Sequence, residues 1–112
     1  MVTPFPGGRA QTSVTAFERS ELQRILDIYG RMVAAGHWRD YAMQFDREVA
    51  SFVAFRRAAD RPEVRIEKRP SLRLNQGAWA LIGEHGGVLK RGHELQPVLA
   101  PLERRLMRLV AD

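Results

Sequence analysis

The side chains of this sequence that could bind a metal or exchange protons are three histidines and a set of scattered carboxylates. His37 and His93 each follow a glycine, and His85 lies in a glycine-rich turn. A histidine zinc site would require these side chains to converge. Histidines in solvated loops need no such role, because imidazole is an ordinary surface group near neutral pH. An enzyme or metal protein built on these histidines and Asp40 is therefore the weakest of three interpretations.

The sequence contains no other pattern that is typical of catalysis. It has no cysteine, which excludes disulfides, thiolate zinc ligands and a cysteine nucleophile. No serine or threonine lies in a nucleophile-elbow context, and Gly86-Gly87 alone is a weak phosphate-loop signal. The carboxylates lie among arginines, as in surface salt bridges; they include Asp40, Asp46, Glu48, Glu63 and Glu67. We therefore predict no catalytic residue, no metal and no cofactor, in a protein that is not an enzyme.

The strongest chemical signal is an excess of basic residues. The net charge is +5, which favours anionic partners such as nucleic acid or an acidic protein. Residues 56–73 carry seven basic and three acidic side chains. With Trp38 or Trp79 nearby for base stacking, such a segment suits contact with a nucleic-acid backbone. The predicted phosphate-contacting residues are Arg56, Arg57, Arg65, Lys68, Arg69, Arg73, Lys90 and Arg91.

The same basic residues have simpler explanations. Sixteen of the 18 are arginine, and the codon usage of a GC-rich genome would raise arginine throughout the chain. Local acids would also balance a merely solvated face. Both explanations stay open beside the nucleic-acid interpretation.

The elements that must position these residues follow from the apolar pattern. Apolar side chains at three- and four-residue spacing predict a first helix that begins near Glu18 or Ser20 and ends at Gly36. The period then changes to two, which is typical of strands. Five short strands are predicted at about 38–46, 49–55, 64–67, 77–83 and 88–91.

Three local expectations accompany this arrangement. The run Val49–Phe55 is apolar on both faces apart from Ser51, so we expect a central strand with a helix on each side. Val14–Phe17 is expected to add a short edge strand. In the loop after Pro70, Leu72 and Leu74 are expected to turn inward.

A second helix is predicted after Gly92. Pro101 lies inside it and removes a backbone donor, so we expect a break or kink near Ala100 and a second helical segment from Pro101. If the apolar stripe of this helix exceeds what one small sheet can cover, the excess forms a homodimer or partner interface. The predicted interface residues are Leu102, Leu106 and Leu109.

The whole pattern predicts an α+β fold: an N-terminal helix, a mostly antiparallel meander of about five strands, and a C-terminal helix kinked near Pro101. Residues 14–112 form one domain, and residues 1–13 are too polar and proline-rich to be ordered. No apolar run approaches the length that a membrane span or a signal peptide requires. The expected location is the cytoplasm, with no membrane partner.

Several segments together resemble a small, mainly alphaproteobacterial family classed as a domain of unknown function. They are YGRMVAAGHWRDYA, FRRA, RIEKRPSL, QGAW and LKRGHEL, which span about residues 17–103. The resemblance implies a single cytoplasmic domain and supplies no activity, cofactor, partner or site residue. Our first hypothesis is a non-enzymatic nucleic-acid-binding module. The alternative is a protein-interaction or homodimerising module that uses the C-terminal helix.

Overall fold

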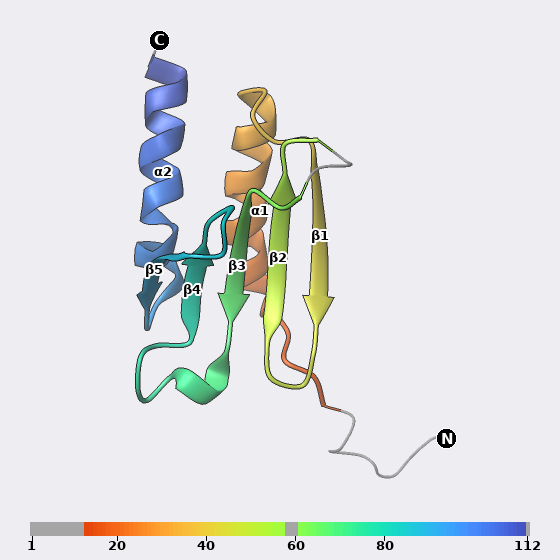
Figure 1. Cartoon of the computed structure of the whole chain (residues 1–112), viewed down its shortest axis with the longest axis vertical. Coiled ribbons are helices and arrows are strands. Elements are labelled where there is room, and N and C mark those ends of the chain that lie inside the picture. The colour runs from red at the N-terminus through yellow and green to blue at the C-terminus, as the bar shows by residue number, and fades with distance from the viewer. Residues whose placement is uncertain (1–12, 58–60, 112) are drawn as a thin grey trace, which may run out of the picture.

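The computed structural model describes residues 13–57 and 61–111 as a five-stranded sheet with two long helices (Figure 1). The predicted tail over residues 1–13 lies outside these residues except for Ser13. The α+β prediction is confirmed. In chain order the elements are α1 (Arg19–Ala34), β1 (Asp40–Phe45), β2 (Ala50–Phe55), β3 (Val64–Lys68), the 3₁₀ turn η2 (Pro70–Leu72), β4 (Trp79–Ile82), β5 (Val88–Gly92) and α2 (Leu95–Ala111).

Helix α1 begins and ends with specific backbone signals. Glu18 is its N-cap, and the Glu18 backbone N–H donates to Oε1 of Glu21 at 2.7 Å, as one half of a capping box. Of the two predicted starts, Glu18 is therefore the one used. At the other end Gly36 has φ of 78°, the left-handed conformation that glycine adopts at little cost. The chain turns there toward β1.

The five strands form an antiparallel meander in the order β1-β2-β3-β4-β5. The register places Met43, Phe52, Ile66 and Leu81 in one row across the sheet. Gly77, just before β4, has φ of 101°, and a Cβ there would lie 2.3 Å from the backbone carbonyl of Gly92. Only glycine permits this close approach of two backbone segments.

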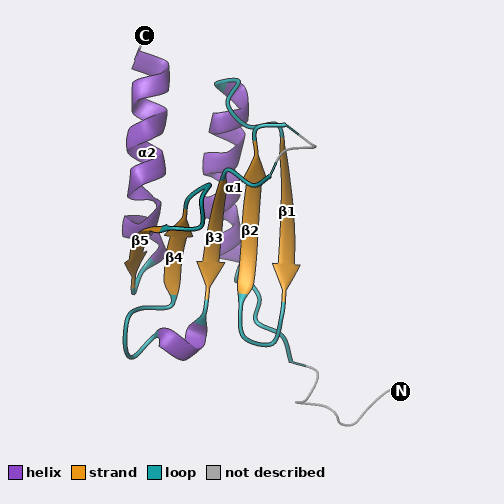
Figure 2. Cartoon of the chain, viewed as in Figure 1, coloured by secondary structure: helices purple, strands orange, loops and turns teal. Residues whose placement is uncertain are grey.

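Both helices cover the same face of the sheet, and α1 and α2 contact each other (Figures 1 and 2). The prediction that β2 has a helix on each side is therefore wrong. After β5 the chain is at the far edge, and α2 packs back over β4 and β5 beside α1. The core lies between this helix pair and the sheet, and its largest fully buried side chains are Trp38, Phe52, Ile25, Ile28, Met32, Ile66, Leu81, Leu99 and Val98.

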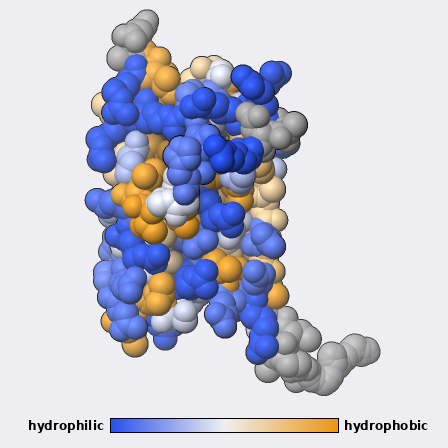
Figure 3. Space-filling model, viewed as in Figure 1, coloured by the Kyte–Doolittle hydropathy of each residue, from blue (hydrophilic) through white to orange (hydrophobic). Residues whose placement is uncertain are grey.

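The other face of the sheet has no helix over it in the described part of the chain. Figure 3, seen from this side, shows hydrophilic residues over most of the face with apolar areas between them. Val53 and Ser51 of β2 are nevertheless buried there. Each lies opposite a long β3 side chain in the register, Arg65 and Glu67 respectively. Long neighbours thus explain how β2 can be apolar on both sides without a second helical layer.

Three smaller expectations are corrected. Val14–Phe17 forms no strand, although the Thr15 N–H donates to the Asp46 carbonyl at 2.7 Å. Leu74 points outward and is 85% exposed. Helix α2 is one helix with Pro101 inside it, so Pro101 does not open a second segment, whereas the predicted kink near Pro101 is consistent with the structure. Pro101 has no N–H to donate to the Pro97 carbonyl, which lies in the first turn of α2. A bend at that turn therefore accommodates the proline without ending the helix.

Candidate functional site

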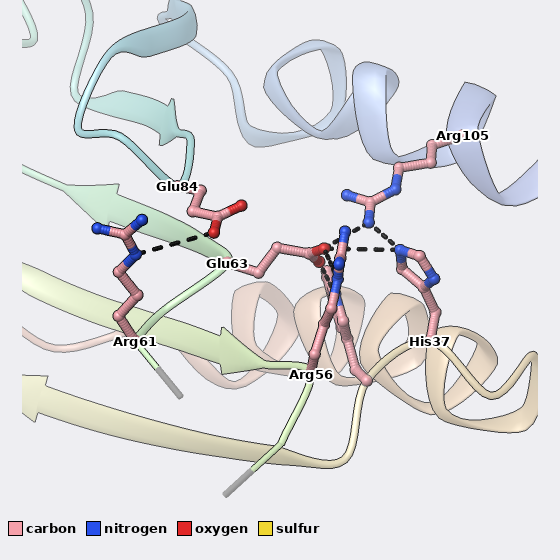
Figure 4. Close-up of polar contacts among 7 residues, drawn as sticks. His37, Arg56, Arg61, Glu63, Glu84 and Arg105 are labelled. Atoms are coloured by element: carbon pink, nitrogen blue, oxygen red, sulfur yellow. Dashed lines mark hydrogen bonds and ion pairs between the residues drawn. The ribbon is translucent and has the colours of Figure 1, made fainter. Parts of the chain in front are cut away.

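The most connected polar group is the carboxylate of Glu63, which lies just before β3 and is 6% exposed. Its Oε2 accepts hydrogen bonds from Nε of Arg56 and from a guanidinium nitrogen of Arg105, each at 2.7 Å. Its Oε1 accepts one from the indole N–H of Trp38. Nε2 of His37 lies 3.6 Å from Oε2 and contacts Arg105. We call these five residues the Glu63 cluster (Figure 4).

Separate elements bring the Glu63 cluster together. The turn at Gly36 places His37 and the buried Trp38 between α1 and β1. The Glu63 N–H donates to the Ala54 carbonyl at 2.8 Å, which extends the β2–β3 pairing to this residue. Arg105 reaches the carboxylate from α2. The cluster therefore ties the second helix to three segments of the sheet.

The hydrogen bonds determine the protonation states in the cluster. Burial disfavours ionisation of Glu63, but donation from Arg105, Trp38 and Arg56 outweighs it and holds the pKa of Glu63 below its ordinary value. Burial and the neighbouring guanidinium of Arg105 lower the pKa of His37. At neutral pH the cluster thus holds an ionised carboxylate and a neutral imidazole. Lowering the pKa of a carboxylate makes it a weaker general base, so the arrangement suits structural locking better than proton transfer.

A small polar pocket of about 160 Å³ adjoins the cluster, lined by Arg56, Arg61, Glu63 and Glu84. Nε of Arg61 lies 3.8 Å from the Glu84 carboxylate, and both side chains are largely exposed. Residues 13–57 and 61–111 contain no group of three or more histidines and carboxylates arranged to hold a metal ion. His93 lies elsewhere, with Nδ1 3.1 Å from the Arg73 carbonyl.

The predicted phosphate-contacting residues of β3 are not on one face. Lys68 lies on the helix side, where its ammonium group is 2.8 Å from Glu21 and 3.0 Å from the Ala16 carbonyl. Arg65 alternates with it on the open side. Arg69 lies within 4.0 Å of carboxylates of Glu48 and Glu67.

The other predicted basic residues are equally dispersed. Lys90 and Arg91 are neighbours on β5, opposite Leu81 and Ala80, so they point to opposite faces. Arg73 follows η2 at one end of the sheet. Arg56, which belongs to the Glu63 cluster, and the adjacent Arg57 follow β2 at the other end. The structure thus distributes these residues over two faces and two ends.

An apolar groove separates the C-terminal parts of the two helices. Its volume is about 320 Å³, and its lining consists of Arg31, Ala34, Ala35, Glu103, Leu106, Met107 and Val110. On its rim the Arg31 guanidinium lies 3.2 Å from the Glu103 carboxylate. Met107 and Val110 are each 66% exposed. The C-terminal part of α2 extends past the ends of the strands, where the sheet cannot cover it (Figure 1).

The predicted interface leucines divide between the core and the surface. Leu102 and Leu106 are 2% and 5% exposed and pack in the core, whereas Leu109 is 39% exposed. Sequence reasoning missed Met107, which lies beside the apolar stripe. The sequence signal for it is the position of Met107 between Leu106 and Val110. There it makes the apolar stripe of α2 wider than the face that packs against the core.

None of the helices in the described part of the chain is both long and apolar enough to cross a membrane.

Comparison with known proteins gives one match. The model of a family described as "Protein of unknown function (DUF2794)" matches residues 15–99. This span includes α1, the five strands of the sheet and four members of the Glu63 cluster, whereas Arg105 and the groove residues of α2 follow it. No curated protein and no solved structure matches the chain.

Proposed function

The chain belongs to this family of unknown function, DUF2794, and we propose that it is a non-enzymatic protein-interaction module whose contact surface is the α1–α2 groove. The observation that carries the proposal is the exposure of apolar side chains along the groove between the C-terminal parts of the two helices. Met107 and Val110 line the groove on the α2 side, and Ala34 and Ala35 line it on the α1 side. Exposed apolar patches with a polar rim are typical of protein-binding surfaces.

The occupant we propose is an amphipathic helix of another protein. The groove is lined by residues of both helices, and a third helix can place apolar side chains in such a groove at three- and four-residue spacing. Arg31 and Glu103 on the rim offer a positive and a negative group to the polar flanks of such a helix. The small side chains of Ala34 and Ala35 leave room in the groove for large apolar side chains of the partner helix.

A photo-crosslinking benzoylphenylalanine in place of Met107 tests this proposal in cells. We expect one covalent adduct, whose attached peptide has apolar residues at helical spacing. Benzoylphenylalanine in place of Leu74, which is 85% exposed on a distant loop, is the matched control and should give no such adduct. Adding Val110→Glu to the Met107 probe should reduce the adduct at least tenfold.

The outcomes that contradict the proposal are definite. An adduct of equal yield at both probe positions would mean non-specific contact. A peptide without helical apolar spacing, or one from a second copy of this chain, would exclude a partner helix as occupant.

Contact with a nucleic-acid backbone is the second candidate function. It is supported by exposed arginines beside the Glu63 cluster, where the side chains of Arg56 and Arg61 are 56% and 68% exposed. Its test is binding of a labelled nucleic-acid pool at low and at moderate salt. Phosphate contacts predict an affinity that falls steeply with salt and weakens further in Arg61→Glu. Failure to bind at low salt would exclude this candidate.

A further inference from the structure

The sheet has an edge strand whose side chains are open to solvent along its whole length. All six residues of β1 are exposed. On the side facing the helices, Tyr41, Met43 and Phe45 are 40%, 37% and 42% exposed, because α1 packs nearer the middle of the sheet. Three large apolar side chains in a row on one strand form a patch that a partner strand could cover.

The backbone N–H and C=O groups of Tyr41, Met43 and Phe45 point away from the sheet. The Asp46 N–H donates to the Val49 carbonyl at 2.9 Å, which fixes the phase of the β1–β2 ladder. Because bonding alternates along an antiparallel strand, Gln44 and Ala42 face β2, while Tyr41, Met43 and Phe45 direct their N–H and C=O groups outward. The Tyr41 N–H donates to the Asp40 carboxylate at 2.8 Å, as an outward N–H without a partner strand would.

The opposite edge is protected in ways that β1 is not. Strand β5 carries Lys90 and Arg91, its pairing with β4 is shifted between Leu81 and Ile82, and α2 packs against it. Charges, irregular pairing and a covering helix are the usual means by which edge strands avoid further pairing. From Tyr41 to Phe45 the sequence is YAMQF, with no charge, proline or glycine.

We propose that two copies of this chain pair their β1 strands antiparallel about a two-fold axis through Ala42, which joins both sheets into one. In this register Tyr41 lies opposite Met43 of the second copy, and Asp40 lies opposite its Gln44. The smallest side chain of the strand is at the axis. The same surface serves both copies, as a two-fold interface requires.

Charge selects this register over those whose axis lies nearer Phe45. An axis through Met43 would place Asp40 opposite Asp46 of the second copy and Arg39 opposite its Arg47. An axis through Gln44 would place Asp40 opposite Glu48. Like charges directly across strands are unfavourable. A shift of the axis by half a residue would place a residue whose backbone groups point outward opposite a residue whose backbone groups point to β2, so the two could not form hydrogen bonds. The Ala42 axis avoids these like-charge pairs and this backbone mismatch. The strand can therefore pair with a second copy of itself, which argues for a second copy as the occupant of the edge.

The proposal is independent of the α1–α2 groove, and its test is the mass of the full chain in solution. Light scattering over a concentration series should show a shift from 12.8 kDa toward twice that mass. Met43→Lys, which places a charge opposite Tyr41 of the second copy, should weaken the dimer at least tenfold. Leu89→Lys is the matched control, because Leu89 is 56% exposed on the protected edge, and it should leave the mass unchanged.

The register has a separate test because the chain has no cysteine of its own. Two directly opposed residues of a non-hydrogen-bonded pair have Cα atoms about 4.5 Å apart, within disulfide range. Ala42→Cys should therefore form a covalent dimer on mild oxidation. Gln44→Cys is the control, because in this register the two Gln44 residues are about 13 Å apart along the strands. A monomer at every concentration, a dimer indifferent to Met43→Lys, or equal cross-linking at both positions would overturn the proposal.

Discussion

The Glu63 cluster and the α1–α2 groove both include side chains of α2 but differ in polarity and exposure. The cluster is polar and closed, with a buried carboxylate that receives three hydrogen bonds. The groove is apolar and open, with side chains that are two-thirds exposed. Only one residue, Leu106, separates Arg105 of the cluster from Met107 of the groove. The charged site is the better candidate for stability, and the apolar site is the better candidate for binding.

The largest predicted effect concerns the closed site. Glu63→Ala leaves the indole N–H of Trp38 without its acceptor and the half-buried Arg105 without its counter-charge. We expect the free energy of unfolding to fall by about 3 kcal/mol, measured by urea denaturation. Glu84→Ala removes an exposed carboxylate beside Arg61 and should cost less than about 1 kcal/mol. Equal losses in the two variants would mean that the cluster does not hold the elements together.

The pH dependence of stability is the next effect in size. The folded-state pKa values of Glu63 and His37 both lie below their ordinary values of 4.5 and 6.5. The folded chain therefore binds fewer protons than the unfolded chain, and stability falls as the pH is lowered. The contribution from His37 is complete above pH 6.5 and is lost below it. The contribution from Glu63 is lost below pH 4.5.

Urea midpoints measured between about pH 8 and pH 4 check this prediction. His37→Gln should flatten the upper part of the profile and leave the lower part. A wild-type profile that rises on acidification across this range would contradict the assigned directions of both pKa shifts.

The smallest predicted effect on stability concerns the open site. Met107→Glu replaces a largely exposed side chain, so the free energy of unfolding should change by no more than about 0.5 kcal/mol. The adduct formed by a photo-crosslinker at Val110 should nevertheless be lost in this variant. A stability loss as large as that of Glu63→Ala would show that Met107 belongs to the core and would remove the contrast between the two sites.

Local patterns predicted the elements well because each depends on neighbouring residues. The 3.6-residue stripe and Gly36 predicted α1, and the alternation after Trp38 predicted the strands of the meander within two residues at most ends. The errors concern tertiary placement. An apolar pattern on both sides of β2 indicates burial, but it cannot distinguish a second helix from the long neighbours Arg65 and Glu67.

The Glu63 cluster was beyond prediction for a related reason. Its members come from residues 37, 38, 56, 63 and 105, and no sequence spacing relates them. In the sequence, Arg56 has the character of a phosphate contact and Glu63 that of a surface acid. Only the packing of α2 beside α1 brings Arg105 to them. Likewise, Leu102 and Leu106 resemble interface residues until the sheet that buries them is in place.

The meander order has a consequence for how the chain folds. Every strand pairs with the strand next to it in sequence, so each pairing closes only a short loop and carries a small entropy cost. The contact of Arg31 with Glu103 joins residues 72 positions apart. The contact between α1 and α2 is therefore the long-range part of the assembly, whereas α2 follows closely on β5, a strand that it packs against. Until α2 packs, the helix-facing side of β4 and β5 stays uncovered, so closing the core depends on the 17 residues of α2.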